Sequence, residues 1–181
     1  MRTLAEIEIE VERLAALIGA SRDVLPTYGR SADFGLPHIE VSDCEYHYVV
    51  VERGQERSRA TTASFDELLF LIFCDVTFDV AVEFELQHRI ELQDCRRVIF
   101  AHQIQLLSAL SSAWADRQAE DHIEILATNP FDDSAGYYAS RIAGYTQAGF
   151  PYGAACKLAA IATTKAKFSA WLQRFIRRTA A

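Results

Sequence analysis

One segment, residues 64–90, constrains the fold of this chain more than any other. It opens with Ser64-Phe65-Asp66-Glu67, a pattern in which the serine oxygen can accept the glutamate amide while the glutamate carboxylate reaches back to the serine amide. The run LLFLIFC that follows is apolar on every side of a helix. Other elements have to cover such a helix, so we expect a long central helix from residue 64 to about residue 90.

The flanking sequence predicts further helices and a small sheet. Residues 4–18 place apolar side chains at helical spacing, although the alternation in EIEIEVE leaves a strand as the alternative. Residues 21–37 are punctuated by glycine and proline and predict a loop. Residues 38–62 hold three short β-branched or aromatic runs separated by turns, which favours an antiparallel meander. A second long helix is predicted over residues 94–117.

The end of the chain is again helical by pattern, from residue 137 onward, with a break around residues 149–153. Its final helix carries an apolar stripe that we expect to be buried against the core: Phe168, Trp171, Leu172 and Phe175. A terminal helix of this kind usually packs its stripe on the core, and a membrane-surface helix is the alternative.

Together these patterns predict an α+β fold. We expect a mostly helical single domain over residues 1–181, with a small antiparallel β meander near residues 38–62 packed on long helices. Residues 134–181 are expected to form a basic C-terminal helical extension packed on this domain.

The charge of the chain changes sign along its length. The net charge is −7, but residues 1–133 hold all 25 acidic residues and 11 arginines, giving −14, while residues 134–181 hold seven basic residues and no acid. This split indicates either two charged surfaces or self-complementary docking of the tail. Nucleic acid is not expected as a partner, because the acidic part would repel phosphates.

Several functional classes are disfavoured by what the sequence lacks. It has no G-x-S-x-G, no phosphate loop and no G-x-G-x-x-G, so we expect neither an enzyme of those types nor a cofactor. The one E-x-x-H, Glu85 to His88, has no second copy, so no metal is expected. Its four cysteines lack zinc spacing and no ~18-residue apolar run occurs, which predicts free thiols, a cytoplasmic location and no membrane partner.

The central helix also carries a stripe of acids. At about 100° per residue, Asp75, Asp79 and Glu83 fall within about 80° of one another, with Glu85 and Arg89 on the near side. The simplest interpretation is a solvated face with an ion pair between Glu85 and Arg89. The alternative is a surface that meets a partner.

Longer stretches resemble a known family. They are LPTYGRSADFGLPHIEV, YHYVVVERG, VTFDVAVEFELQHRIELQDCRRVIFAHQIQLLSAL and NPFDD, with E-x-E-L-x-H-R-x-x-x-Q-D-x-R-R as the most specific part. Residues 25–133 thereby resemble the immunity protein 63 family of bacterial polymorphic toxin systems. The resemblance implies a cytoplasmic, non-catalytic protein that binds and neutralises a co-encoded toxin, and it supplies no binding residues.

We therefore predict a partner-binding surface for a cognate, basic toxin domain around the acidic stripe and the junction of the two long helices. The predicted residues are Asp75, Asp79, Glu83, Glu85, His88, Arg89, Asp94 and Arg97. The same charges could instead form an internal network that fixes a helix corner. Two other functions stay open: an enzyme of unrecognised type using the Glu/His/Arg cluster, or an adaptor that binds through its basic C-terminal helix.

Overall fold

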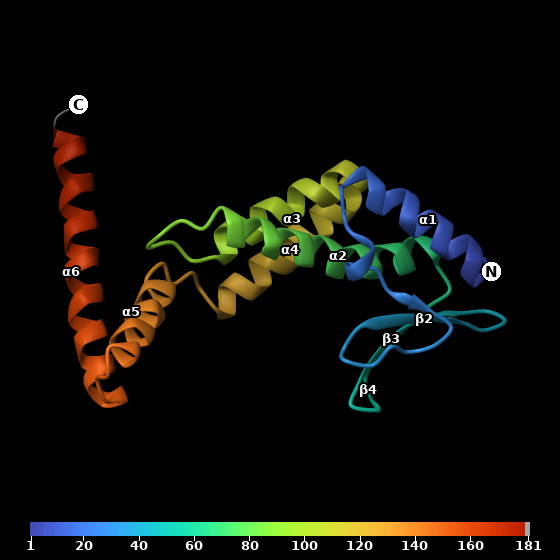
Figure 1. Ribbon diagram of the computed structural model, residues 1–181. Coiled ribbons are helices and arrows are strands. Elements are labelled where there is room, and N and C mark those ends of the chain that lie inside the picture. The colour runs from blue at the N-terminus through green and yellow to red at the C-terminus, as the bar shows by residue number, and fades with distance from the viewer. Residues whose placement is uncertain (180–181) are drawn as a thin grey trace. The chain divides into compact units, whose positions relative to one another are not determined.

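The computed structural model describes the backbone of residues 1–179 and the side chains of residues 1–173. The chain divides into two compact units. The first comprises residues 1–87 and 99–127, and the second comprises residues 88–98 and those from 128 onward. The α+β class is confirmed, because helices predominate and accompany a small sheet (Figure 1). The packing of residues 134–181 on the rest as one domain stays a prediction.

The first unit is built around the predicted central helix. Its helices are α1 (Leu4–Leu17), α2 (Phe65–Gln87), most of α3 (Arg96–Leu110) and α4 (Ser112–Thr128). Side chains of α2 such as Leu68, Ile72 and Phe73 are wholly buried, together with Ile7 of α1 and Leu107 of α3. Burial on several sides of α2 is what the apolar run of residues 68–74 requires.

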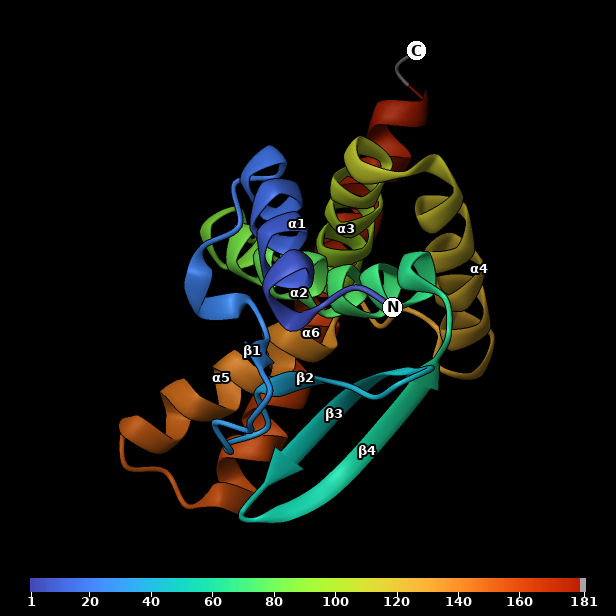
Figure 2. The same ribbon diagram turned by 90° about the vertical axis from the view of Figure 1, so that its right-hand side faces the viewer.

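The sheet of the first unit has four strands in the order β1-β2-β3-β4 (Figure 2). They are β1 (Thr27–Tyr28), β2 (Pro37–Val41), β3 (Tyr46–Glu52) and β4 (Gln55–Thr62). The antiparallel pairing of β2, β3 and β4 confirms the meander. The short β1 pairs parallel to β2 within a segment predicted as loop. Alternation turns Tyr46 and Tyr48 of β3 toward the helices, where α2 packs.

The start of α2 follows the predicted cap only in part. The Glu67 amide donates to Ser64 Oγ at 3.2 Å, as expected. The Glu67 carboxylate, however, accepts from the Arg117 guanidinium of α4, and that guanidinium lies 3.9 Å from the centre of the Phe70 ring. The carboxylate thus joins α2 to α4 instead of closing the cap.

Three other boundaries refine the sequence prediction. The strand alternative for residues 4–18 is wrong, because α1 forms with Thr3 and Glu6 as a complete capping box. The long helix predicted over residues 94–117 is two helices, interrupted at Ser111. The central helix ends at Gln87, three residues earlier than expected.

A buried polar group ties three helices of the first unit together. Gln103 of α3 donates its amide to the carbonyl of Cys74 in α2 at 2.9 Å. Its Oε1 lies 3.0 Å from Nε2 of His122 in α4, whose ring stacks on Phe100 at 3.8 Å. Burial lowers the pKa of His122, so this ring is neutral and contributes to the core through its hydrogen bond and its stacking.

The second unit contains a helical hairpin, α5 (Ala135–Gln147) and α6 (Tyr152–Thr179), joined through Gly149 at φ 89°. Up to residue 173, where the described side chains end, the buried side chains of α6 are small: Ala155, Ala159 and Thr163. Small side chains let two helices approach closely.

Within the second unit the apolar stripe of α6 is not buried as expected, and its packing on the first unit stays a prediction. Phe168, Trp171 and Leu172, expected to be buried, are 62%, 57% and 41% exposed, and the fourth member, Phe175, lies outside the described side chains. The amphipathic pattern identified the apolar side of α6 correctly. It could not tell whether that side is covered.

Candidate partner-binding cleft

The first unit has a cleft where α2 meets the sheet. Its volume is about 220 Å³. The lining residues come from the segment before β2, from the first residue of β2, from β3 and from α2: Val24, Pro26, Gly35, Leu36, Pro37, Tyr48, Val50, Asp75, Phe78 and Asp79. Most of these side chains are apolar, and the polar groups are one phenol and two carboxylates. The cleft therefore combines apolar walls with concentrated negative charge.

Local structure explains why these side chains converge. Asp75 and Asp79 are four residues apart on α2 and project from the same side of the helix. Tyr48 and Val50 are two residues apart on β3 and share the face turned toward α2. The spacing of the two acids was visible in the sequence, but the register that brings β3 opposite them was not.

The rim of the cleft is a tight turn before β2. Asp33, Phe34 and Gly35 all have positive φ angles, 63°, 58° and 80°. Such angles strain the two non-glycine residues. The Gly35 amide donates to the Val51 carbonyl of β3 at 2.9 Å, which fastens the turn to the sheet. The Phe34 side chain in this turn is 94% exposed.

Tyr48 and Asp75 form the polar floor. The Tyr48 hydroxyl donates to Asp75 Oδ2 at 2.7 Å, bridging β3 and α2. Burial raises the pKa of the Asp75 carboxyl, and this hydrogen bond partly offsets the rise. Burial, and next the charge of Asp75, raises the pKa of Tyr48. The phenol therefore stays protonated and continues to donate.

Asp79 adds a second carboxylate without a counter-charge. Burial raises the pKa of Asp79, and the negative charge of Asp75 raises it further. No ion pair joins either carboxylate to a basic side chain among the residues whose side chains are described. Two like charges thus sit side by side in a partly desolvated cleft. A cationic group placed there would relieve both the repulsion and the desolvation.

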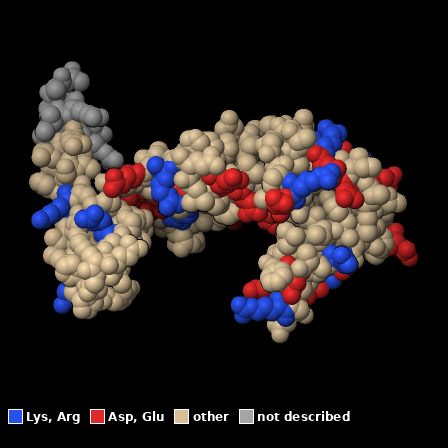
Figure 3. Space-filling model, in the orientation of Figure 1, with Lys and Arg blue, Asp and Glu red and all other residues tan. Residues whose placement is uncertain are grey.

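Exposed aromatic surface adjoins the acidic pair. Phe78, one residue from Asp79, is 42% exposed and lines the cleft, and the exposed Phe34 directly precedes Gly35, another lining residue. Exposed aromatic side chains beside a charged recess are typical of protein-binding surfaces. Figure 3 shows acidic side chains gathered over the region of α2 and α4 on the face that it draws.

The remaining predicted residues of α2 and its end are placed differently. Glu83 is exposed two turns beyond Asp75 on α2, whereas Glu85 is buried. His88 and Arg89 follow the end of α2 and are exposed, and they belong to the second unit. His88 thus lies outside the helix. The eight predicted residues do not form one continuous helical stripe.

Asp94, also in the second unit, is the centre of an internal network. Its Oδ2 accepts from Arg96 Nη2 and from the Asp132 amide, both at 2.8 Å. The Arg96 guanidinium also donates to the carbonyls of Asn129 and Pro130. The hydrogen bonds from Arg96, first of all, lower the pKa of Asp94 to about 2. Asp94 is therefore ionised and buried in a satisfied site.

Arg97 completes this network from the next position. It donates to both oxygens of Asp133, at 2.7 and 3.1 Å, and its guanidinium lies 4.1 Å from the centre of the Phe131 ring. Asp133 also accepts the Asp94 amide at 3.0 Å. Residues 94–97 and 129–133 are thus joined by a clasp of charged hydrogen bonds. This geometry favours the internal network for Asp94 and Arg97, and their contact with a partner stays a prediction.

Only Asp75 and Asp79 of the ten cleft residues were predicted, and the other eight, among them Gly35, Leu36, Tyr48 and Phe78, were not. Tyr48 and Phe78 were assigned to apolar or strand positions, and only the pairing of β3 with α2 makes them neighbours of Asp75. The glycines and prolines of residues 21–37 signalled a loop without signalling its contacts. Strand register relative to a helix is a tertiary property, so no local pattern carries it.

In the part of the chain that the structure describes, no group of three or more His, Cys, Asp or Glu side chains could hold a metal ion. Over the same residues, no helix combines the length and apolarity needed to traverse a bilayer. All four cysteines, Cys44, Cys74, Cys95 and Cys156, are free thiols, as predicted.

Comparison with known proteins finds a match to a family of immunity proteins over the segment that supplies half of the cleft residues. The family is immunity protein 63, and its model matches residues 42–124, which confirms the predicted resemblance. The match spans β3, β4, α2, α3 and most of α4, and it includes Tyr48, Val50, Asp75, Phe78 and Asp79. No curated protein and no solved structure matches the chain significantly.

Proposed function

We propose that this protein is a non-catalytic immunity protein that binds and neutralises a cognate toxin through the acidic cleft. The match of residues 42–124 to the immunity protein 63 family is the observation that carries this proposal, because that family implies a protein of toxin systems. The matched segment supplies half of the cleft residues, including both carboxylates. Free cysteines fit a reducing compartment, so we place the protein in the cytoplasm.

The chemistry of the cleft defines the contact that it would make. Asp75 and Asp79 are acceptors with no basic partner among the described side chains, and they are partly shielded from water. An arginine or lysine side chain of the toxin would form charge-assisted hydrogen bonds there. Its aliphatic stem would pack on the apolar wall that includes Phe78. Binding would lower the pKa of both carboxyls, because an opposite charge favours their ionised form.

The proposal is tested by binding between the full chain and the toxin domain encoded beside it. Replacing Asp75 and Asp79 together by Asn keeps the shape of both side chains and removes both charges. We expect the affinity to fall by roughly 30-fold or more, because truncating a desolvated charge pair typically costs about 2–5 kcal/mol. Calorimetry measures the affinity, and growth rescue on co-expression measures protection.

A matched control removes the same charge elsewhere. Asp116 and Glu120 are both exposed and four residues apart on α4, so Asp116→Asn with Glu120→Gln changes the net charge equally outside the cleft. This control should bind within about threefold of the unmodified chain. Equal losses in both double variants would assign the effect to net charge and remove the cleft as the site. Absence of binding by the unmodified chain would contradict the immunity function with this toxin.

A further inference from the structure

The α5–α6 hairpin presents a bulky apolar face that the first unit's function does not use. We define the outer stripe as Ile161, Phe168, Trp171 and Leu172 of α6; Ile161 is 54% exposed, and the other three are the exposed residues described above. At about 100° per residue these side chains span about 100° of the helix. The buried Ala155, Ala159 and Thr163 lie on the opposite side. The helix therefore turns its small face inward and its bulky face outward.

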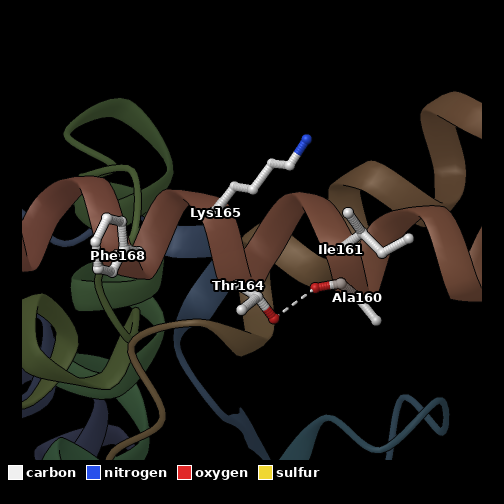
Figure 4. Close-up of a pocket in the computed structure, with 5 residues that line it drawn as sticks. All are labelled: Ala160, Ile161, Thr164, Lys165 and Phe168. Atoms are coloured by element: carbon white, nitrogen blue, oxygen red, sulfur yellow. Dashed lines mark hydrogen bonds between the residues drawn. The ribbon is translucent and has the colours of Figure 1, made fainter.

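This arrangement reverses the usual order of an amphipathic helix, whose large apolar side chains face a core. Phe168 and Trp171 stack at 5.8 Å between ring centres, so the stripe is continuous at its aromatic end. An open groove of about 660 Å³ runs along this helix, lined by Ala160, Ile161, Thr164, Lys165 and Phe168. Figure 4 shows these residues following one another along α6, with the Lys165 side chain extending away from the helix. Continuous exposed apolar surface of this kind marks a binding face.

Charge restricts what can cover the outer stripe. Residues 134–181 carry seven basic residues and no acid, and Figure 3 shows basic but no acidic side chains on the hairpin. Lys157 and Lys165 lie about 40° to either side of Ile161 on the helix and are both exposed. A second copy docked stripe to stripe would bring these lysines together with no carboxylate in either hairpin to pair with them. The occupant should therefore be anionic.

We propose that the hairpin binds an anionic lipid surface, with α6 lying in the plane of the membrane and the outer stripe inserted at the headgroup boundary. Apolar and aromatic side chains on one face with lysines at its edges are typical of helices that lie on membranes. The lysine stems can follow the apolar surface while their ammonium groups reach lipid phosphates. A tryptophan such as Trp171 is well suited to the interface. The sequence analysis predicted no membrane partner from the lack of a long apolar run, and it left a membrane-surface helix as the alternative for this segment.

The negative net charge of the whole chain does not oppose this binding. The Debye length is about 8 Å at physiological ionic strength, so a lipid surface senses the charge close to it. Asp132 and Asp133 line a pocket together with Lys167 and Trp171 of α6, but the second unit as a whole holds ten basic residues against four acids. The helix need not cross the membrane, and none of the described helices has the composition to do so. An acidic protein would satisfy the charge as well, but flanking lysines around a helix face with exposed aromatic rings favour lipid.

The test uses the full chain and phosphatidylcholine vesicles with or without phosphatidylglycerol. We expect cosedimentation with the phosphatidylglycerol vesicles only, weakened at least tenfold by 1 M salt. Lys157→Gln with Lys165→Gln should weaken it at least threefold. Trp171 fluorescence should shift to shorter wavelength on binding, and the shift should vanish in Trp171→Phe, because the other tryptophan, Trp114, is already buried.

A matched pair of variants isolates the stripe. Phe168→Gln with Leu172→Gln should abolish vesicle binding. The control, Ile9→Gln with Ile123→Gln, replaces two exposed apolar side chains of the first unit and should bind normally. If the stripe variant loses helix content by circular dichroism, quenching of Trp171 by brominated lipid in the unmodified chain provides the independent readout, and no quenching overturns the proposal.

Three results would contradict the lipid surface. They are equal binding to both kinds of vesicle, no binding to either, or full binding by the stripe variant. A concentration-dependent dimer in light scattering that this variant abolishes would assign the stripe to a second copy. Stoichiometric capture of the stripe by the purified toxin domain would assign it to a protein. Either outcome would replace the lipid surface as the occupant.

Discussion

At the residue scale, the fold of the free protein disfavours the ionised forms of Asp75 and Asp79. The pKa of each carboxyl is raised, so near those pKa values the folded state retains protons that the unfolded chain releases. Stability therefore falls as pH rises through the raised pKa values, and both charges destabilise the free protein at neutral pH. Binding of a cation would remove this penalty, so the same two residues oppose stability and support function.

This conflict predicts that Asp79→Asn stabilises the free protein while it weakens toxin binding. The gain should be a few tenths of a kcal/mol at pH 7, after allowance for solvent screening at a partly exposed site. It should disappear near pH 3, where the carboxyl is protonated. Urea unfolding at both pH values measures it, and Glu83→Gln, at an exposed position on the same helix, is the control. A gain of equal size at both pH values would attribute the effect to packing.

Prediction from the sequence was least complete for the individual residues of the site. The i, i+4 spacing of Asp75 and Asp79 follows from helical geometry alone, and the structure places both in one cleft. Tyr48 and Phe34 could not be added, because the first depends on how β3 meets α2 and the second on a turn with positive φ angles. Contacts across elements need tertiary information that a periodic pattern lacks.

At the scale of elements, the clasp between residues 94–97 and 129–133 holds the second unit's two segments together. Asp94 has a pKa of about 2, well below its ordinary value, so it stabilises the fold above the unfolded pKa of about 4, and this contribution is lost as pH falls toward 2. Asp94→Ala should lower stability by about 1–3 kcal/mol at pH 7, because it leaves buried donors unsatisfied. Hydrogen exchange should rise in residues 129–135, while the exposed substitution Asp116→Ala leaves it unchanged.

Agreement between Asp94→Ala and the unmodified chain at pH 7 would contradict a structural role for the clasp. A loss of toxin binding without a loss of protection from exchange would instead support the predicted contact of Asp94 and Arg97 with a partner. The two outcomes separate the network from the interface at the same residues.

Elements were predicted well where a local signal defines them. α1 and α2 begin at capping residues, and β2, β3 and β4 follow the β-branched runs between turns. The break at Ser111 lacks the glycine or proline that usually marks one, so it was missed. The outward face of α6 was missed for another reason. An apolar stripe indicates a side that needs covering, and it does not indicate the partner that covers it.

At the scale of the whole molecule, each unit has its own chemistry: an acidic first unit with the cleft, and a hairpin that carries only basic charge. The core residues Ile7, Phe73, Leu107 and Trp114 all lie in the first unit. A chain truncated after Ser134 keeps this core and the clasp. We expect it to melt within about 3 °C of the full chain, because the described bulky side chains of α6 that are lost were exposed. A collapse of the melting transition would show that the hairpin supports the first unit.

The same truncation predicts how the molecule meets its toxin. Residues 1–133 carry −14, against −7 for the whole chain, so removing the hairpin doubles the net negative charge. If the toxin domain is basic, as we propose, attraction over several ångströms steers the encounter and raises the association rate. The truncated chain should therefore associate about two- to tenfold faster than the full chain at low salt. Its rate should fall more steeply with salt, because screening shortens the Debye length to about 3 Å at 1 M. Stopped-flow kinetics at several salt concentrations measures the association rate and its salt dependence for both chains.

Dissociation rates should stay similar, since the cleft is unchanged. Equal association rates and equal salt slopes for the two chains would mean that charge near the cleft alone sets the encounter. Slower association of the truncated chain would place part of the toxin interface on the hairpin.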